Sequence, residues 1–88
     1  MPLTEDVEFL ARLQKFNRVQ IPVEVRCRYK LERGEILKAE VRLAGGAGFE
    51  RFFARLLGDG RITVPWEVIL KLEADKQRYL LAVRLKPK

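Results

Sequence analysis

The chain has 88 residues, of which 48% are hydrophobic and 34% charged, and its formal net charge at pH 7 is +6. No apolar run approaches the roughly 20 residues that a membrane-spanning helix needs, so we expect no membrane span. With no His, no Ser and one Cys, the sequence shows no constellation of residues typical of a metal site or a nucleophilic triad, and it excludes an internal disulfide. We therefore expect no cofactor, no metal and no enzymatic activity.

A tandem repeat organises the chain. The stretch RVQIPVEV at residues 18–25 returns as RITVPWEV at residues 61–68, an offset of 43. At the same offset the Ala-Arg-Leu of residues 11–13 falls on residues 54–56. At an offset of 42 the Val-Arg-Leu of residues 41–43 falls on residues 83–85. Repeats at a fixed period indicate a duplicated structural unit.

The first copy begins with two strands and a tight turn. Alternating apolar side chains predict a half-buried strand over residues 9–14 and a second strand over residues 18–21. Residues 15–17 form the turn between them, where Asn17 tolerates a positive φ and its counterpart Gly60 does so more easily. We expect the two strands to form a hairpin, with Arg18 on its outward side.

A short helix and a third strand complete the unit. Pro22 lacks an N–H group, which ends the second strand and suits the first turn of a helix. Val25 and Tyr29, four residues apart, give that helix an inward stripe, and Cys27 is interpreted as a small buried hydrophobe. Alternation then predicts a strand over residues 37–43.

The second copy repeats this plan. The sequence predicts inward residues along 52–56, a turn before Arg61, a helix from Pro65 to about Leu72 and a last strand over residues 79–85. Glu24 and Glu67 lie at the helix starts, where the helix dipole explains a carboxylate without catalysis.

Four segments follow from this pattern. They are a polar N-terminal arm (1–7), a first repeat (8–43), a Gly/Ala linker (44–48) and a second repeat (49–88). A unit of about 40 residues rarely buries enough apolar surface to fold alone, so the two repeats must share one core.

The pattern of Gly or Asn, Arg, an alternating strand and then Ile/Val-Pro-x-Glu-Val resembles the DNA-binding domain of AbrB-type transcription regulators, the swapped-hairpin β-barrel family. The match is strong over residues 60–65 and good over residues 17–22. The resemblance implies a mostly β fold with short helices, in which two copies exchange hairpins to close one small barrel. Here one chain would supply both copies, as a single-chain pseudo-dimer.

The same resemblance implies a role for basic residues beside the hairpins and early in the helix. The matching positions for duplex DNA contacts are Arg12, Arg18, Arg26, Arg55 and Arg61. The hairpin arginines of both copies would form one clustered guanidinium surface. The ordinary alternative is that these residues are solvated strand positions. Ile69 replaces Arg26 in the second copy, so the copies differ in surface.

The second helix carries extra apolar residues. Trp66, Ile69 and Leu70 are a candidate partner interface, for another subunit or for the N-terminal arm, and ordinary burial is the alternative. Two rival functions remain open at this stage. One is a protein-interaction module, and the other is an antitoxin-like protein without a tail that would wrap a toxin.

The basic composition agrees with a polyanionic partner. The pI is near 9.9, and each phosphate that a Lys or Arg neutralises releases condensed counterions. The opening residues lack the basic stretch and apolar run of a secretory signal. We therefore expect a cytoplasmic, nucleoid-associated transcription regulator that contacts duplex DNA.

Overall fold

The computed structural model describes residues 3, 5–45, 48–72 and 80–87, which form a mostly β fold with two short helices. In chain order its elements are β1 (Val7–Arg12), η1 (Lys15–Asn17), β2 (Arg18–Gln20), α1 (Val23–Arg28), β3 (Ile36–Leu43), β4 (Glu50–Arg55), β5 (Arg61–Thr63), α2 (Trp66–Leu72) and β6 (Leu80–Lys86). The predicted order of strands and helices is confirmed for these residues. The start of the predicted last strand, Tyr79, lies outside the described residues.

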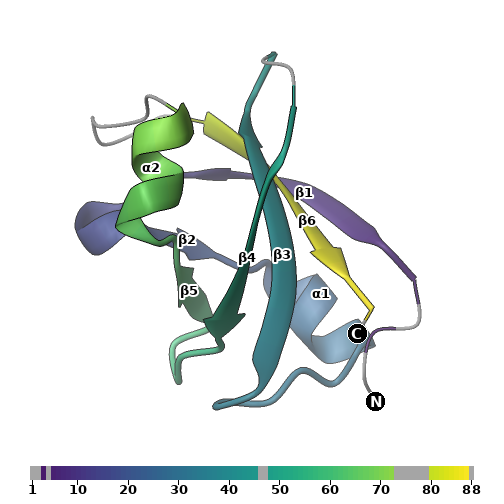
Figure 1. Cartoon of the computed structure of the whole chain (residues 1–88). Coiled ribbons are helices and arrows are strands. Elements are labelled where there is room, and N and C mark those ends of the chain that lie inside the picture. Colours follow the sequence, from purple (N-terminus) through teal and green to yellow (C-terminus); the bar gives the residue numbers. More distant parts are fainter. Residues whose placement is uncertain (1–2, 4, 46–47, 73–79, 88) are drawn as a thin grey trace.

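The described strands form two separate sheets (Figure 1). Strands β1, β6, β3 and β4 make a four-stranded antiparallel sheet in that order, while β2 and β5 make a two-stranded one. The sheets are not closed into the predicted barrel. Strands β2 and β5 are three residues long, and Pro22 and Pro65 lie two residues after the last residue of each strand. A proline has no N–H with which to extend a ladder towards the larger sheet.

Among the described residues, each β-ladder pairs a strand of the first repeat, before residue 44, with a strand of the second repeat, after residue 48. Within the first copy, Gln14, two residues after the end of β1, forms an isolated bridge with Arg18 of β2. The predicted hairpin of the first copy is therefore a turn with one bridge, and both of its strands pair with the second copy. At the centre of the small sheet, Val19 faces Ile62, its counterpart at the offset of 43.

The register corrects the alignment of the last strands. Ala11 faces Leu81, and its counterpart Ala54 faces Leu37. Leu37 and Leu81 are therefore counterparts, at an offset of 44 and not 42. Because a shift of two residues keeps a side chain on the same face, the local alternation could not reveal this difference.

The core lies between the two sheets and against α2. Its largest fully buried side chains are Val19, Ile21, Val41, Ile62, Val64, Ile69, Leu81, Val83 and Leu85. Leu3, placed by the sequence in a polar arm, is also buried and belongs to this core. β1 starts at Val7, one residue before the expected beginning of the ordered repeat.

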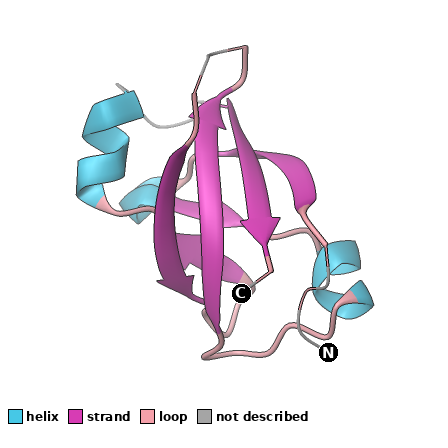
Figure 2. Ribbon diagram, turned by 45° about the vertical axis from the view of Figure 1, so that its right-hand side comes forward, coloured by secondary structure: helices cyan, strands magenta, loops and turns pink. Residues whose placement is uncertain are grey.

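The two helices lie on opposite sides of the sheets (Figures 1 and 2) and differ in burial. Helix α2 buries Val68, Ile69 and Leu72, whereas α1 has no buried residue within its bounds. Helix α1 meets the core through Val25 and, just past its end, Tyr29.

The prediction that Cys27 is buried is wrong, because its side chain is exposed. Cys27 lies two residues from both Val25 and Tyr29, about half a helical turn away from the inward stripe. None of the described helices is long and apolar enough to span a membrane.

Candidate nucleic-acid interface

Arg18 and Arg61 come together on the outward face of the two-stranded sheet. Arg18 faces Thr63 across the ladder and Arg61 faces Gln20, which makes the two arginines diagonal neighbours. Such neighbours are separated by roughly 7–8 Å between their Cα atoms. The opposite face of the same ladder carries the fully buried Val19 and Ile62. The side chains of Arg18 and Arg61 therefore leave the ladder on the face opposite the core.

The charge of Arg61 is neutralised within its own turn. Its Nη1 lies 2.6 Å from Asp59 Oδ2, and its Nε donates a hydrogen bond of 2.6 Å to Gln14 Oε1. The hydrogen bond from Arg61 lowers the pKa of Asp59 from its ordinary value of 3.8, against the opposing effect of desolvation. Asp59 is therefore ionised at neutral pH and remains paired with Arg61.

Arg18 has a different environment. In the part of the chain that the structure describes, no carboxylate forms an ion pair with it, and its buried Nε has no hydrogen-bond partner. Its Cζ lies 5.7 Å from the centroid of the Phe16 ring. The positive charge of Arg18 is consequently not cancelled by a neighbouring acid.

Arg26 reaches from α1 to the turn of the other copy. Its Nε donates a hydrogen bond of 3.1 Å to the backbone oxygen of Ile21. Its guanidinium lies so close to Gly60 that a Cβ at this position would collide with it. Gly60 also has a φ of 83°, which a glycine adopts without strain. Arg26 thus packs on the second turn and does not extend freely from the helix.

Ile69, the counterpart of Arg26, does not belong to the predicted partner interface. Its side chain is fully buried, so Ile69 cannot be part of an exposed interface. Trp66 and Leu70 are more than half exposed and lie one turn apart on α2. Because successive helical residues are rotated by about 100°, Ile69 can face the core while Leu70 faces outward.

Arg12 and Arg55 do not join the Arg18–Arg61 pair in one cluster. Each ends an edge strand of the four-stranded sheet, β1 or β4, and these two edge strands run antiparallel to each other. The two arginines therefore occupy diagonally opposite corners of the sheet. Both are exposed, and Arg55 Nη1 donates a hydrogen bond of 3.0 Å to the backbone oxygen of Gly34. Each nevertheless precedes one of the two turns along the chain.

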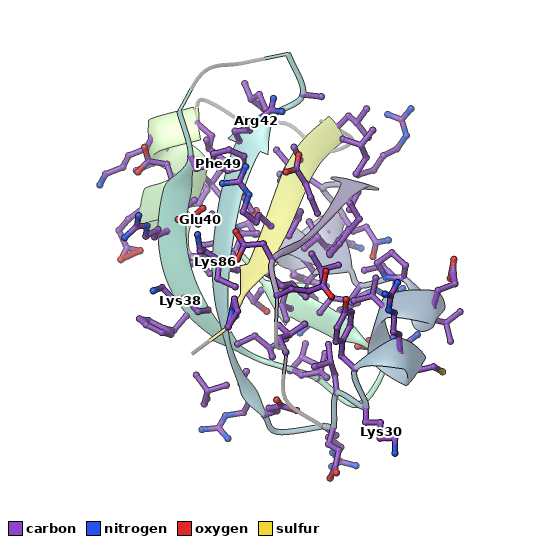
Figure 3. All side chains as sticks on the ribbon, turned by 90° about the vertical axis from the view of Figure 1, so that its right-hand side faces the viewer. Lys30, Lys38, Glu40, Arg42, Phe49 and Lys86 are labelled. Atoms are coloured by element: carbon purple, nitrogen blue, oxygen red, sulfur yellow. The ribbon has the colours of Figure 1, made fainter. Side chains whose placement is uncertain are left out.

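A second group of charges crosses the outer face of the four-stranded sheet. Register places Glu8, Arg84, Glu40 and Arg51 side by side on the four strands, with alternating sign. Glu40 accepts hydrogen bonds of 2.6 Å from Arg51 and 3.3 Å from Arg84. Figure 3 shows Glu40 between Phe49 and Lys86 on this face.

Glu40 is only 3% exposed, and opposing effects act on its pKa. Desolvation by burial raises the pKa, but the hydrogen bond from Arg51 and the charges of Lys86, Arg51 and Arg84 outweigh it and hold the pKa below its ordinary value of 4.5. The ionised carboxylate of Glu40 therefore links β3 to β4 and to β6 through its hydrogen bonds with Arg51 and Arg84.

Two residues of the turns were missed by the sequence analysis. The repeat offset of 43 aligns Phe16 with Asp59, so one turn carries an exposed aromatic side chain where the other carries an acid. This mismatch was visible in the sequence. Its effect on Arg18 and Arg61 depends on side-chain distances, which the alignment alone does not give.

Comparison with known proteins identifies a solved structure with a similar fold. No family model matches the chain, and no curated protein matches it. A solved structure described as the solution structure of PHS018 from Pyrococcus horikoshii is similar over 98% of this chain and 99% of that one, with a TM-score of 0.77 and 21% sequence identity. A likeness at that identity bears on the fold alone.

Proposed function

We propose that the chain binds duplex DNA through the outward face of β2 and β5 and the two turns beside it, as a transcription regulator of the AbrB type. The observation that carries the proposal is the pair of diagonal arginines, Arg18 and Arg61, held outward by a fully buried ladder face. Guanidinium groups bind phosphates and guanine edges with two hydrogen bonds each. Two such groups held side by side on a β-ladder can contact phosphates of the DNA backbone.

The proposal includes a strand-exchanged pseudo-dimer made from one chain. It is supported by the ladders, since each described one pairs a strand of one copy with a strand of the other. Counterparts also face each other at two places, Val19 opposite Ile62 and Glu40 opposite Arg84. An approximate two-fold axis would pass through both pairs. In this arrangement neither copy has a complete sheet without the other.

Affinity would come mainly from phosphate contacts. Arg18 contributes an unpaired charge, while Arg12 and Arg55 lie in the strands that lead into the two turns and are proposed to contact flanking phosphates. Arg26 supports the second turn through Gly60. A surface of this kind makes the binding constant fall steeply with salt concentration.

The test compares two double variants of equal charge. Replacing Arg18 and Arg61 with Ala should lower the affinity for a duplex by about tenfold or more and reduce the salt slope by about one, because Arg18 carries the charge of the pair that no described acid neutralises. Replacing Lys38 and Lys86 with Ala, on the outer face of the other sheet, removes the same charge. Fluorescence anisotropy at several salt concentrations measures both. Equal losses in the two double variants would contradict the assignment.

A second candidate function rests on the exposed face of α2. Trp66 and Leu70 are 56% and 54% exposed, which is unusual for large apolar side chains one helical turn apart. They fit a protein contact, including self-association of the chain. Sedimentation at micromolar concentration would give the mass of one chain or two. Replacing Trp66 and Leu70 with Ala should then return an associated form to the mass of one chain.

A further inference from the structure

The turn formed by η1 displays an aromatic side chain in a strained backbone. Phe16 is 70% exposed, and its φ is 64°. Asn17 beside it has a φ of 59°. Asparagine tolerates this left-handed region, but a bulky residue there is an outlier, and Gly or Asn would make the turn more easily. The phenyl ring buries only a minor part of its surface, which offsets little of the strain. Its presence therefore calls for another explanation than folding.

Two cations flank the ring. Lys15 Nζ lies 5.6 Å and Arg18 Cζ 5.7 Å from its centroid. In the described residues, the other strongly exposed aromatic side chains, Phe53 and Trp66, have no cation over their rings. Phe16 thus combines exposure with charges suited to phosphate. Exposed apolar side chains such as Phe are the wedges that some DNA-binding proteins insert between base steps.

The other turn lacks this arrangement. At the position of Phe16 it carries Asp59, whose carboxylate pairs with Arg61 and would repel phosphate at close range. The second turn places no bulky residue in the left-handed backbone region, because its positive φ belongs to Gly60. A contact with bases through a turn tip is consequently available to the first copy and not to the second.

We propose that Phe16 is a wedge that inserts at one base step of duplex DNA, with Lys15 and Arg18 holding the phosphates beside that step. The inference rests on the proposed binding of duplex DNA and adds how the turn would act on it. Insertion unstacks the step and bends the duplex. Binding should therefore favour flexible pyrimidine–purine steps, which are the easiest to unstack.

The test uses the full chain and a duplex with one central TA step, in which 2-aminopurine replaces the adenine. The unmodified protein should raise the 2-aminopurine fluorescence and bring end-attached dyes closer together. Replacing Phe16 with Ala should abolish both signals and weaken binding about tenfold, the usual loss for one stacked base. The salt slope should stay the same, because no phosphate contact is removed. Phe16→Trp should retain both signals.

Two further variants separate the wedge from other effects. Phe16→Asn relieves the backbone strain and should keep or raise the melting temperature while losing the fluorescence signal. Phe53→Ala removes a phenyl ring of similar exposure, 66%, from the outer face of the larger sheet and should behave like the unmodified protein. Equal losses from Phe53→Ala and Phe16→Ala would overturn the proposal.

The outcomes also distinguish this inference from the function on which it rests. If Phe16→Ala still unstacks the step while the Arg18/Arg61 double variant loses binding, the wedge is wrong and the DNA-binding function stands. If the unmodified protein binds no duplex even at low salt, the function itself is wrong.

Discussion

The two turns beside β2 and β5 occupy equivalent places in the repeat and have opposite chemistry. In the first, Phe16 stands exposed between Lys15 and Arg18, and no described carboxylate pairs with Arg18. In the second, Asp59 pairs with Arg61, and Arg26 packs on Gly60. The ends of the two turns are alike, since Asn17 and Gly60 each have a positive φ and each accepts a backbone hydrogen bond from the other copy. The two copies therefore keep their turns at equivalent positions but carry different side chains there.

The difference teaches that one chain can specialise its two halves in a way that a homodimer cannot. A homodimer would display the same turn twice, with two acids or two aromatic tips. In the proposed pseudo-dimer, one turn can be cationic while the other is nearly neutral. If the chain binds duplex DNA as proposed, we expect the first turn to hold most of it.

The junction of the copies shows the same divergence. Glu40 and Arg84 are counterparts in the register and face each other in the β3–β6 ladder, where they form an ion pair of 3.3 Å. In a homodimer of either copy, two identical charges would face each other at this place, which destabilises a ladder. The opposite charges thus favour pairing of the first copy with the second.

The largest expected effect comes from this junction. Glu40→Gln removes the charged partner of Arg51 and Arg84 and should lower the free energy of unfolding by about 2 kcal/mol at neutral pH, as for other hydrogen bonds to a charged group. Denaturant unfolding at pH 7 measures it. Glu24→Gln, an exposed glutamate of α1, is the matched control and should change little.

The same variant should also change the pH dependence. Because the pKa of Glu40 is lowered in the folded state, its carboxylate stabilises the fold above the ordinary value of 4.5, and this contribution is lost as the pH falls through the lowered pKa. Glu40→Gln should therefore lose less stability than the unmodified chain between pH 7 and pH values of about 3. An unchanged acid profile would contradict a stabilising role for the ionised carboxylate.

A smaller effect is expected when the first turn is given the acid of the second. Phe16→Asp would place a carboxylate beside Arg18 and should weaken duplex binding by more than the roughly tenfold loss expected for Phe16→Ala, because it also neutralises one cation and repels the phosphates. Phe53→Asp adds the same charge to the outer face of the larger sheet. If both variants weaken binding equally in anisotropy titrations, net charge and not the turn determines affinity.

The smallest effect is expected in the opposite direction. Asp59→Asn should release Arg61 and raise duplex affinity about threefold, with a salt slope steeper by about one. Asp6→Asn is the matched control, since it frees Lys86 from an ion pair of 3.3 Å on the larger sheet. A gain with Asp6→Asn as large as with Asp59→Asn would remove the difference between the two turns.

Much of the fold could be predicted because its signals are local. Alternation located the strands, Pro22 and Pro65 marked the starts of the helices, and Asn17 and Gly60 located the turns. The candidate site was predicted in part. Arg18 and Arg61 lie together as expected, but Arg12 and Arg55 are at opposite corners and Ile69 is buried. Those outcomes depend on strand pairing and helix orientation.

The sequence by itself determined the duplication, the order of the elements and the positions of the turns, because each depends on residues that are neighbours along the chain. Only the tertiary structure decided which strands pair, the offset of 44 in the last strand, and the neighbours of each arginine. Pairing between strands far apart in sequence is selected by the whole buried face at once, and a shift of two residues leaves the local pattern unchanged. Phe16 and Asp59 therefore occupy equivalent positions in the sequence, and the contacts that Arg18 and Arg61 make in the folded chain give the two turns different chemistry.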